Sequence, residues 1–119
     1  MIMTDFRAET QASWVVTAEK IEEAVRRIVE AARPVRVVLF GSHARGEARP
    51  DSDVDLLVVE ENVKDAPGEA TRLYQCVRDS LMAVDIVVVD RKRFDYWKDT
   101  PGNVYYEAAQ DGRSLYEAA

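Results

Sequence analysis

Apolar and polar positions along the chain first follow a helical period. Between Thr17 and Pro34, the apolar residues Ile21, Val25 and Ile28 recur at three- and four-residue spacing, with charged residues between them. Thr17 is an acceptable N-cap, and a proline ends a helix because it cannot continue the hydrogen-bond ladder. This pattern predicts an amphipathic helix between these two residues.

Three later runs are continuously apolar and predict buried strands over residues 35–40, 53–59 and 84–89. Helical spacing returns in residues 68–81, 91–98 and 103–110. Gly112 is then expected as the C′ residue of the last helix, before a short strand over 113–116. The predicted order is helix, strand, turn, strand, helix, strand, helix, helix, strand. It indicates an α/β (α+β) fold in which a small mixed sheet is flanked by helices.

The lengths of the connections predict how the first three strands pair. Residues 42–52 are too few for a usual helical crossover, so the first two strands are expected to be antiparallel neighbours. Residues 60–83 contain a predicted helix, so the second and third strands are expected to be parallel. The end of the first strand and the starts of the next two should therefore meet at one edge of the sheet.

That edge collects an unusual set of polar residues. Asp53 and Asp55 open the second strand, and because they are two apart they project to the same side. Asp85 opens the third strand, and Gly41 and Ser42 follow the first. An Asp-x-Asp pair alone is more often a strand cap or a solvated pair, but the expected topology adds a third carboxylate to it.

Three carboxylates held close together repel one another unless a cation joins them. Hard oxygen ligands favour Mg²⁺ or Mn²⁺ over zinc, and two ions about 3.5–4 Å apart suit in-line displacement at phosphorus. A glycine followed by a serine that opens a helical turn can approach and hold a phosphate oxygen. Without the carboxylates, the same Gly41-Ser42 step would be an ordinary turn.

Other motifs with related spacing do not fit. Residues 41–46 have the glycine spacing of a P-loop, but Glu47 and Ala48 replace its Lys and Ser or Thr. Residues 51–62 begin like an EF-hand, but they lack its turn glycine and its bidentate Glu. The lone His43 could contact a nucleotide, yet as the second residue of an exposed turn it is more simply incidental.

Composition restricts the class of protein further. The chain has 119 residues, which suits a single domain over residues 17–119 after a loosely ordered extension over residues 1–16. No membrane span or secretory signal is expected, and the single Cys76, on the apolar face of its helix, is expected to fill the core. A cytoplasmic protein is therefore expected. The 16 basic and 22 acidic residues give a net charge of −6, so general nucleic-acid binding is not expected.

The stretch GSHARGEARPDSDVDLLV, residues 41–58, resembles the signature of the DNA polymerase β-type nucleotidyltransferase superfamily. Its Arg45-Gly46 step and its short serine-to-aspartate spacing resemble the minimal nucleotidyltransferase (MNT) branch, and the resemblance covers about residues 17–117. It implies a nucleotidyltransferase fold in which Gly41, Ser42 and Arg45 bind the triphosphate of ATP. It also implies that Asp53, Asp55 and Asp85 bind Mg²⁺, two ions in all, and that Asp85 helps to deprotonate the attacking hydroxyl.

Relatives of this size are typically antitoxins paired with a HEPN protein, a helical ribonuclease toxin. The resemblance therefore implies transfer of AMP from ATP to a toxin tyrosine, which neutralises the toxin. Two alternatives remain open: an antitoxin that acts by binding alone, and a transferase that modifies a small hydroxylated molecule. The basic and aromatic segment 91–98 is a candidate docking face, although Phe94 and Trp97 at helical spacing more simply pack back onto the sheet.

Overall fold

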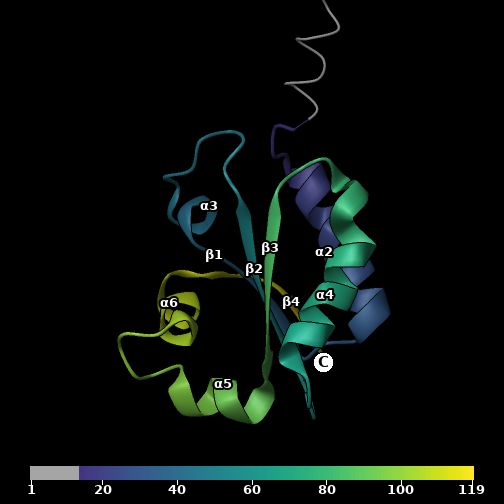
Figure 1. The fold of residues 1–119 in the computed structure, drawn as a ribbon. Helices are drawn as coiled ribbons and strands as arrows, with labels where there is room; N and C mark the ends of the chain where they lie inside the picture. The colour runs from purple at the N-terminus through teal and green to yellow at the C-terminus, as the bar shows by residue number, and fades with distance from the viewer. Residues whose placement is uncertain (1–13) are drawn as a thin grey trace, which may run out of the picture.

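The computed structural model describes residues 14–119, which form a four-stranded sheet in the order β3-β2-β1-β4 (Figure 1). Most of the predicted N-terminal extension, residues 1–13, lies outside the described residues. In chain order the elements are α2 (Ala18–Ala32), β1 (Arg36–Phe40), α3 (Ser42–Arg45), β2 (Val54–Glu60), α4 (Ala66–Val77), a 3-10 turn (Arg78–Ser80), β3 (Val84–Asp90), α5 (Arg91–Trp97), α6 (Val104–Asp111) and β4 (Arg113–Glu117).

The pairing of the strands confirms the topology expected from the connection lengths. β1 and β2 are antiparallel, β2 and β3 are parallel, and β4 pairs antiparallel with the other side of β1. The parallel pair is joined through α4, which packs against β3. The sheet is therefore mixed, as predicted, and β3 and β4 are its two edges.

The ends of α2 follow from its local sequence. The hydroxyl of Thr17 accepts the N–H of Lys20 at 3.1 Å, which caps the first turn. Arg33 ends the helix in the left-handed region at φ 46, just before Pro34. Helix α4 begins two residues earlier than its pattern predicted, because Asp65 accepts the N–H of Gly68 at 3.1 Å and caps the helix.

Gly112 has a different role from the one predicted. It follows α6 directly, but its backbone is extended, with φ −78 and ψ 167, rather than left-handed. A methyl group at this position would collide with the carbonyl of Ala108 and the side chain of Val38. The glycine is therefore required by the close approach of α6 to β1, and its conformational freedom is not used.

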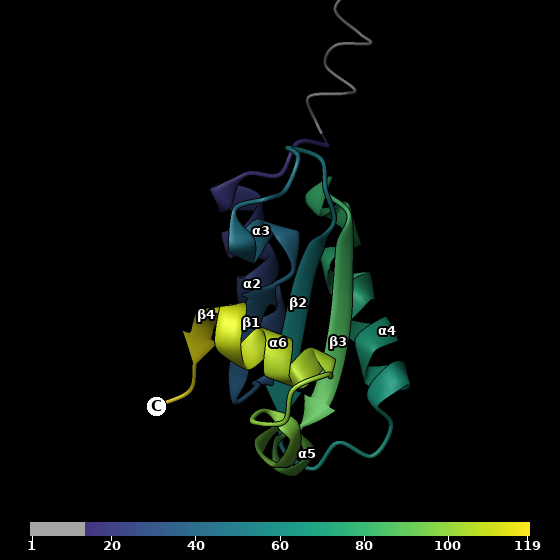
Figure 2. The same ribbon diagram turned by 90° about the vertical axis from the view of Figure 1, so that its left-hand side faces the viewer.

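Apolar residues cover both faces of the sheet, which explains the continuous apolar runs of the central strands. On one face α2 and α4 pack over residues that include Val37, Leu56 and Val58. On the other face α5 and α6 pack over Val38 and Leu57, among others. Figure 2 shows α6 crossing in front of the sheet while α2 and α4 lie behind it.

A main-chain hydrogen bond joins the residues before α2 to the loop between α3 and β2. The N–H of Val16 donates to the carbonyl of Pro50 at 2.8 Å. Among the described residues, no helix is both long and apolar enough to cross a membrane.

Candidate functional site

Gly41 joins the end of β1 to α3 and lies directly against β2. The last residue of β1, Phe40, is in register with Asp55 of β2. Gly41 has a φ of 75, which is strained for any other residue, and a methyl group on it would collide with the Asp55 carboxylate. Both the backbone angle and the packing therefore require glycine at this position.

Two of the three carboxylates expected at this edge, Asp55 and Asp85, lie on adjacent strands, and Asp53 directly precedes β2. Asp55 and Asp85 are register partners in the parallel pair, so they project side by side onto the face that α6 covers. Asp53 comes two residues before Asp55. Asp53 and Asp85 are exposed, whereas Asp55 is half-buried. Within residues 14–119, no three Asp, Glu, His or Cys side chains already converge in a way that would hold a metal ion. The backbone brings the three residues together, but their side chains are not closed around a common point.

The cluster affects the ionisation of its central member. Burial raises the pKa of the Asp55 carboxyl, and the negative charges of Asp85, Asp53 and Glu107 raise it further, while His43 acts in the opposite direction. The ionised form of Asp55 is thus disfavoured by both desolvation and repulsion. A cation bound between these carboxylates would remove the repulsion.

Glu107 of α6 is a member of this site that the sequence did not indicate. Its carboxylate lies 3.5 Å from Nη1 of Arg45, across 62 residues of chain. Nε of Arg45 also donates to Glu47 at 2.9 Å. Two carboxylates therefore hold the arginine that follows Ser42 by one helical turn. No local pattern could have shown this pairing, because it depends on how α6 crosses the sheet.

His43 is half-buried, and the prediction that it is exposed was wrong. Its Nε2 lies 2.8 Å from the carbonyl of Ser52, directly before Asp53. The hydroxyl of Ser52 in turn accepts the N–H of Arg49 at 2.9 Å. The histidine thus connects α3 to the end of the loop that leads into β2.

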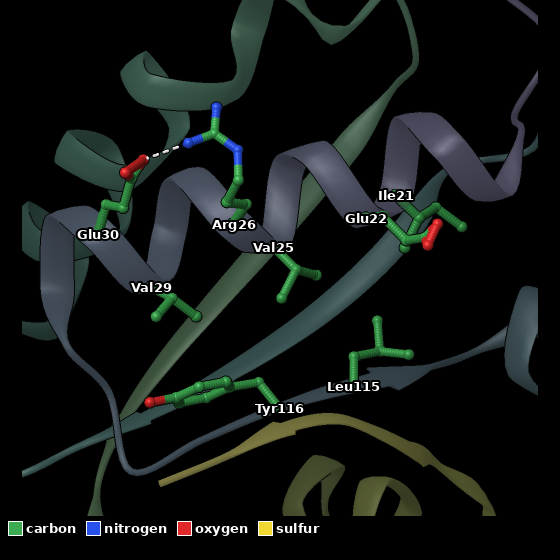
Figure 3. Close-up of a pocket in the computed structure, with 8 residues that line it drawn as sticks. All are labelled: Ile21, Glu22, Val25, Arg26, Val29, Glu30, Leu115 and Tyr116. Atoms are coloured by element: carbon green, nitrogen blue, oxygen red, sulfur yellow. Dashed lines mark hydrogen bonds and ion pairs between the residues drawn. The ribbon is translucent and has the colours of Figure 1, made fainter.

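Two of the hollows in residues 14–119 lie on opposite faces of the sheet. A polar one of about 500 Å³ runs along α6 and is lined by Gly102, Asn103, Val104, Tyr106, Glu107 and Asp111. An apolar one of about 370 Å³ lies between α2 and β4, where Leu115 and Tyr116 face Val25 and Val29 (Figure 3). The second is on the α2 face, away from Asp55, and the first shares Glu107 with the acidic cluster.

The segment 91–98 only partly fits the docking face considered for it. Phe94, on α5, is buried against the sheet, and the guanidinium of Arg36 lies 6.0 Å from the centre of its ring. Trp97 is half-buried, whereas Tyr96 is 71% exposed. Phe94 thus packs onto the sheet, which leaves Tyr96 as the exposed aromatic residue of the segment. Cys76 is half-buried and packs against the core, as expected.

Comparison with known proteins agrees with this arrangement. A family model described as "Nucleotidyltransferase domain" matches residues 18–107. Comparison with curated proteins gives no match.

Several solved structures share the fold. A Sulfolobus solfataricus protein described as a nucleotidyltransferase is 21% identical at a TM-score of 0.55, and the alignment covers 83% of this chain and 78% of that one. A toxin-antitoxin complex with AMP-PNP is 18% identical at a TM-score of 0.52, covering 82% and 73%. A spectinomycin adenyltransferase from Enterococcus faecialis, with ATP and spectinomycin, is 15% identical at a TM-score of 0.62, covering 87% of this chain and 57% of that one. At these identities the likeness concerns the fold alone.

Proposed function

Because the chain belongs to the nucleotidyltransferase domain family, we propose that it transfers AMP from ATP to a tyrosine hydroxyl of a partner protein, a HEPN ribonuclease toxin. The observation that carries the proposal is the register of the parallel strands. It places Asp85 directly beside Asp55, at the end of the sheet where Gly41 and Ser42 leave β1. Carboxylates and a phosphate-binding turn are the two parts that metal-dependent nucleotidyl transfer needs.

The donor set of the site fits Mg²⁺. Asp53, Asp55 and Asp85 offer hard carboxylate oxygens. Burial and then repulsion from the neighbouring carboxylates raise the pKa of Asp55, and a cation would relieve the repulsion. These three residues would hold the metal after rotation about their side-chain bonds, since Asp55 and Asp85 are register partners and the charge of Asp53 already acts on Asp55. Bound Mg²⁺ would neutralise charge on the triphosphate and on the reacting oxygens.

The remaining residues would position the nucleotide. Gly41 lets the main chain approach a phosphate closely, and the hydroxyl of Ser42 can donate to a phosphate oxygen. Arg45, which is held by Glu47 and Glu107, supplies a planar cation that can pair with a second phosphate oxygen. The polar hollow along α6 lies next to Glu107 and offers space for the nucleoside.

The reaction is a substitution at the α-phosphorus of ATP. The acceptor hydroxyl oxygen forms a bond to this phosphorus while the bond to the oxygen bridging to the β-phosphate breaks. The hydroxyl proton passes to the carboxylate of Asp85, and pyrophosphate leaves with the electron pair of the broken bond. The products are an adenylylated acceptor and pyrophosphate.

A transfer assay with ATP labelled at the α-phosphate tests the proposal. The protein is incubated with Mg²⁺, labelled ATP and either a HEPN-type protein encoded beside it or spectinomycin, because the fold is shared with both kinds of relative. Label on a tyrosine of the partner protein supports the proposal. Label on spectinomycin would instead favour the small-molecule alternative. Inhibition of the toxin without transfer would favour an antitoxin that acts by binding alone.

A further inference from the structure

The two edges of the sheet are built differently. β4 has five residues, carries Arg113 and Glu117 at its ends, and shifts register against β1. Short length, charge and irregular pairing are the usual means by which proteins protect an open edge. β3 is longer and regularly paired, and its charged residues are Asp85 near its start and Asp90 at its end. Its seven residues keep unbroken register with β2, and all five residues other than Asp85 and Asp90 are β-branched. Within residues 14–119, no strand pairs with the outer edge of β3.

The main chain of β3 offers hydrogen-bonding groups along this edge. The N–H of Val54 donates to the carbonyl of Ala83 at 2.8 Å, and bonding residues alternate along a parallel pair. The main-chain groups of Asp85 and Val87 therefore point to β2. Those of Val84, Ile86 and Val88 point away from the sheet and can pair with an added strand.

The surroundings of this edge differ on its two sides. On the α4 side lies a hollow of about 310 Å³, lined by Ala70, Thr71, Tyr74, Val84, Asp85 and Ile86. The side chain of Tyr74 is 46% exposed there. On the α6 side lie the carboxylates of Asp85 and Asp55. The exposed edge thus separates a partly apolar hollow from the acidic cluster, and Figures 1 and 2 show β3 at the margin of the sheet, beside α4.

We propose that the outer edge of β3 binds the acceptor protein through an extended segment, which adds a strand to the sheet and places its hydroxyl residue opposite Asp85. This inference rests on the proposed function and names the surface that presents the acceptor. Side chains paired across two strands point to the same face, about 4.5–5.5 Å apart at Cβ. A tyrosine opposite Asp85 therefore projects over the acidic cluster, where its proton passes to Asp85 as its oxygen bonds to the α-phosphorus and pyrophosphate leaves.

The same geometry defines which segment fits. Residues before and after the acceptor tyrosine project to the α4 side, so apolar side chains there would fill the hollow beside Tyr74 and Ile86. Residues two away project over the carboxylates, where basic side chains are favoured. The chain's net charge of −6 also attracts a basic segment. The fitting acceptor is thus an extended, basic segment with a tyrosine between apolar neighbours.

Two variants test this docking surface. Ile86→Pro removes an outward N–H at an edge position, where proline is tolerated, and Tyr74→Ala removes the aromatic wall of the hollow without changing the main chain. Tyr96→Ala is the matched control, because Tyr96 is also an exposed tyrosine on a helix but lies on α5. We expect kcat/KM for AMP transfer to the partner protein to fall at least tenfold in Ile86→Pro and about threefold to tenfold in Tyr74→Ala. Tyr96→Ala should match the wild type, and thermal stabilisation by Mg²⁺-ATP should be equal in all four proteins.

The outcomes separate this inference from the function on which it rests. If the wild type labels no protein, the proposed function fails and this inference fails with it. If the wild type labels the partner and both edge variants do so at its rate, the inference alone is overturned. Amide hydrogen exchange gives an independent measurement that needs no variant. Protection of Val84, Ile86 and Val88 on adding partner and AMP-PNP supports the surface, whereas protection that rises with the concentration of this chain alone would assign the edge to a second copy.

Discussion

At the scale of single residues, Gly41 combines two requirements that only glycine meets. Gly41→Ala forces a methyl group into the Asp55 carboxylate and a side chain into a positive φ. We expect a loss of about 1–3 kcal/mol in the free energy of unfolding from the backbone, because φ 75 with ψ −157 is a region essentially restricted to glycine. We also expect AMP transfer to fall by about a hundredfold, because Asp55 must move. Chemical denaturation and the transfer assay measure the two effects.

Gly46→Ala is the matched control for this change. Gly46 also has a positive φ, 73, but a methyl group there meets nothing within 4 Å. Gly46→Ala should therefore lose about 1–2 kcal/mol of unfolding free energy from its left-handed backbone, and it should transfer AMP at the wild-type rate. Equal loss of transfer in both variants would show that the contact with Asp55 is unimportant.

Asp55→Asn separates the stability of the cluster from its activity. The folded-state pKa of Asp55 is raised, so its contribution to stability is present at low pH and is lost as the pH rises through that pKa. At neutral pH the variant should therefore melt at the wild-type temperature or slightly above it. Transfer should fall at least about a hundredfold, as expected on loss of a group that stabilises reacting charge. A variant that melts far below the wild type would instead identify Asp55 as a structural cap.

Glu60, at the opposite end of β2, predicts a second pH effect. Burial and the neighbouring Glu69 raise the pKa of its carboxyl from 4.5 to about 7. The folded state thus holds a proton that the unfolded state releases, and stability falls as the pH rises between these two values. The pKa of Glu69 is lowered, mainly by its hydrogen bond with Arg72. Its contribution to stability is therefore lost only as the pH falls below 4.5, outside the range considered for Glu60.

Urea unfolding between pH 4.5 and 8 measures the contribution of Glu60. The wild type should lose on the order of 1 kcal/mol across this range, a modest amount because the carboxyl is partly open to solvent. Over the same pH range, Glu60→Gln should lose on the order of 1 kcal/mol less unfolding free energy than the wild type, because it lacks the titrating carboxyl. The exposed neighbour provides the control Glu61→Gln, which should follow the wild type. Parallel curves for wild type and Glu60→Gln would refute the effect.

At the scale of secondary structure elements, the contact between α6 and β1 depends on Gly112. Gly112→Ala has an allowed backbone, φ −78 and ψ 167, so any loss of stability comes from the collision with Ala108 and Val38. We expect about 1–3 kcal/mol, typical of overpacking. Gly102→Ala, in open space at φ 97, lacks this collision and should lose only the energy of backbone strain. A Gly112→Ala variant that melts at the wild-type temperature would show that α6 can shift to accommodate the methyl group.

The elements themselves were largely predictable. Periodicity and runs of β-branched residues identified the helices and strands to within a few residues, because these patterns follow from the two side-chain repeats. The start of α4 was missed because Asp65 is a capping residue outside the apolar pattern. Gly112 was misassigned because a glycine required for close packing looks the same in sequence as one required for a left-handed turn.

At the scale of the whole molecule, nucleotide binding should stabilise the fold only with its metal. A ligand that binds only the folded state stabilises it by about 2.7 kcal/mol at 100 times its Kd. We therefore expect Mg²⁺-ATP to raise the melting temperature, and a chelator to remove most of that rise. Asp53→Asn should show a smaller rise than the wild type and an unchanged melt without ligand. An equal rise with ATP and chelator would contradict a role for the carboxylates in binding through metal.

The sequence by itself determined the elements, the pairing of the first three strands and the candidate chemistry. Periodicity, caps and connection lengths act over short distances, and they were enough to bring Asp85 next to Asp55. The tertiary structure alone decided which distant side chains meet, such as Glu107 with Arg45, and which edge of the sheet stays open. Those features depend on how α6 packs across the strands and where β4 joins them, and no local pattern in the chain encodes either.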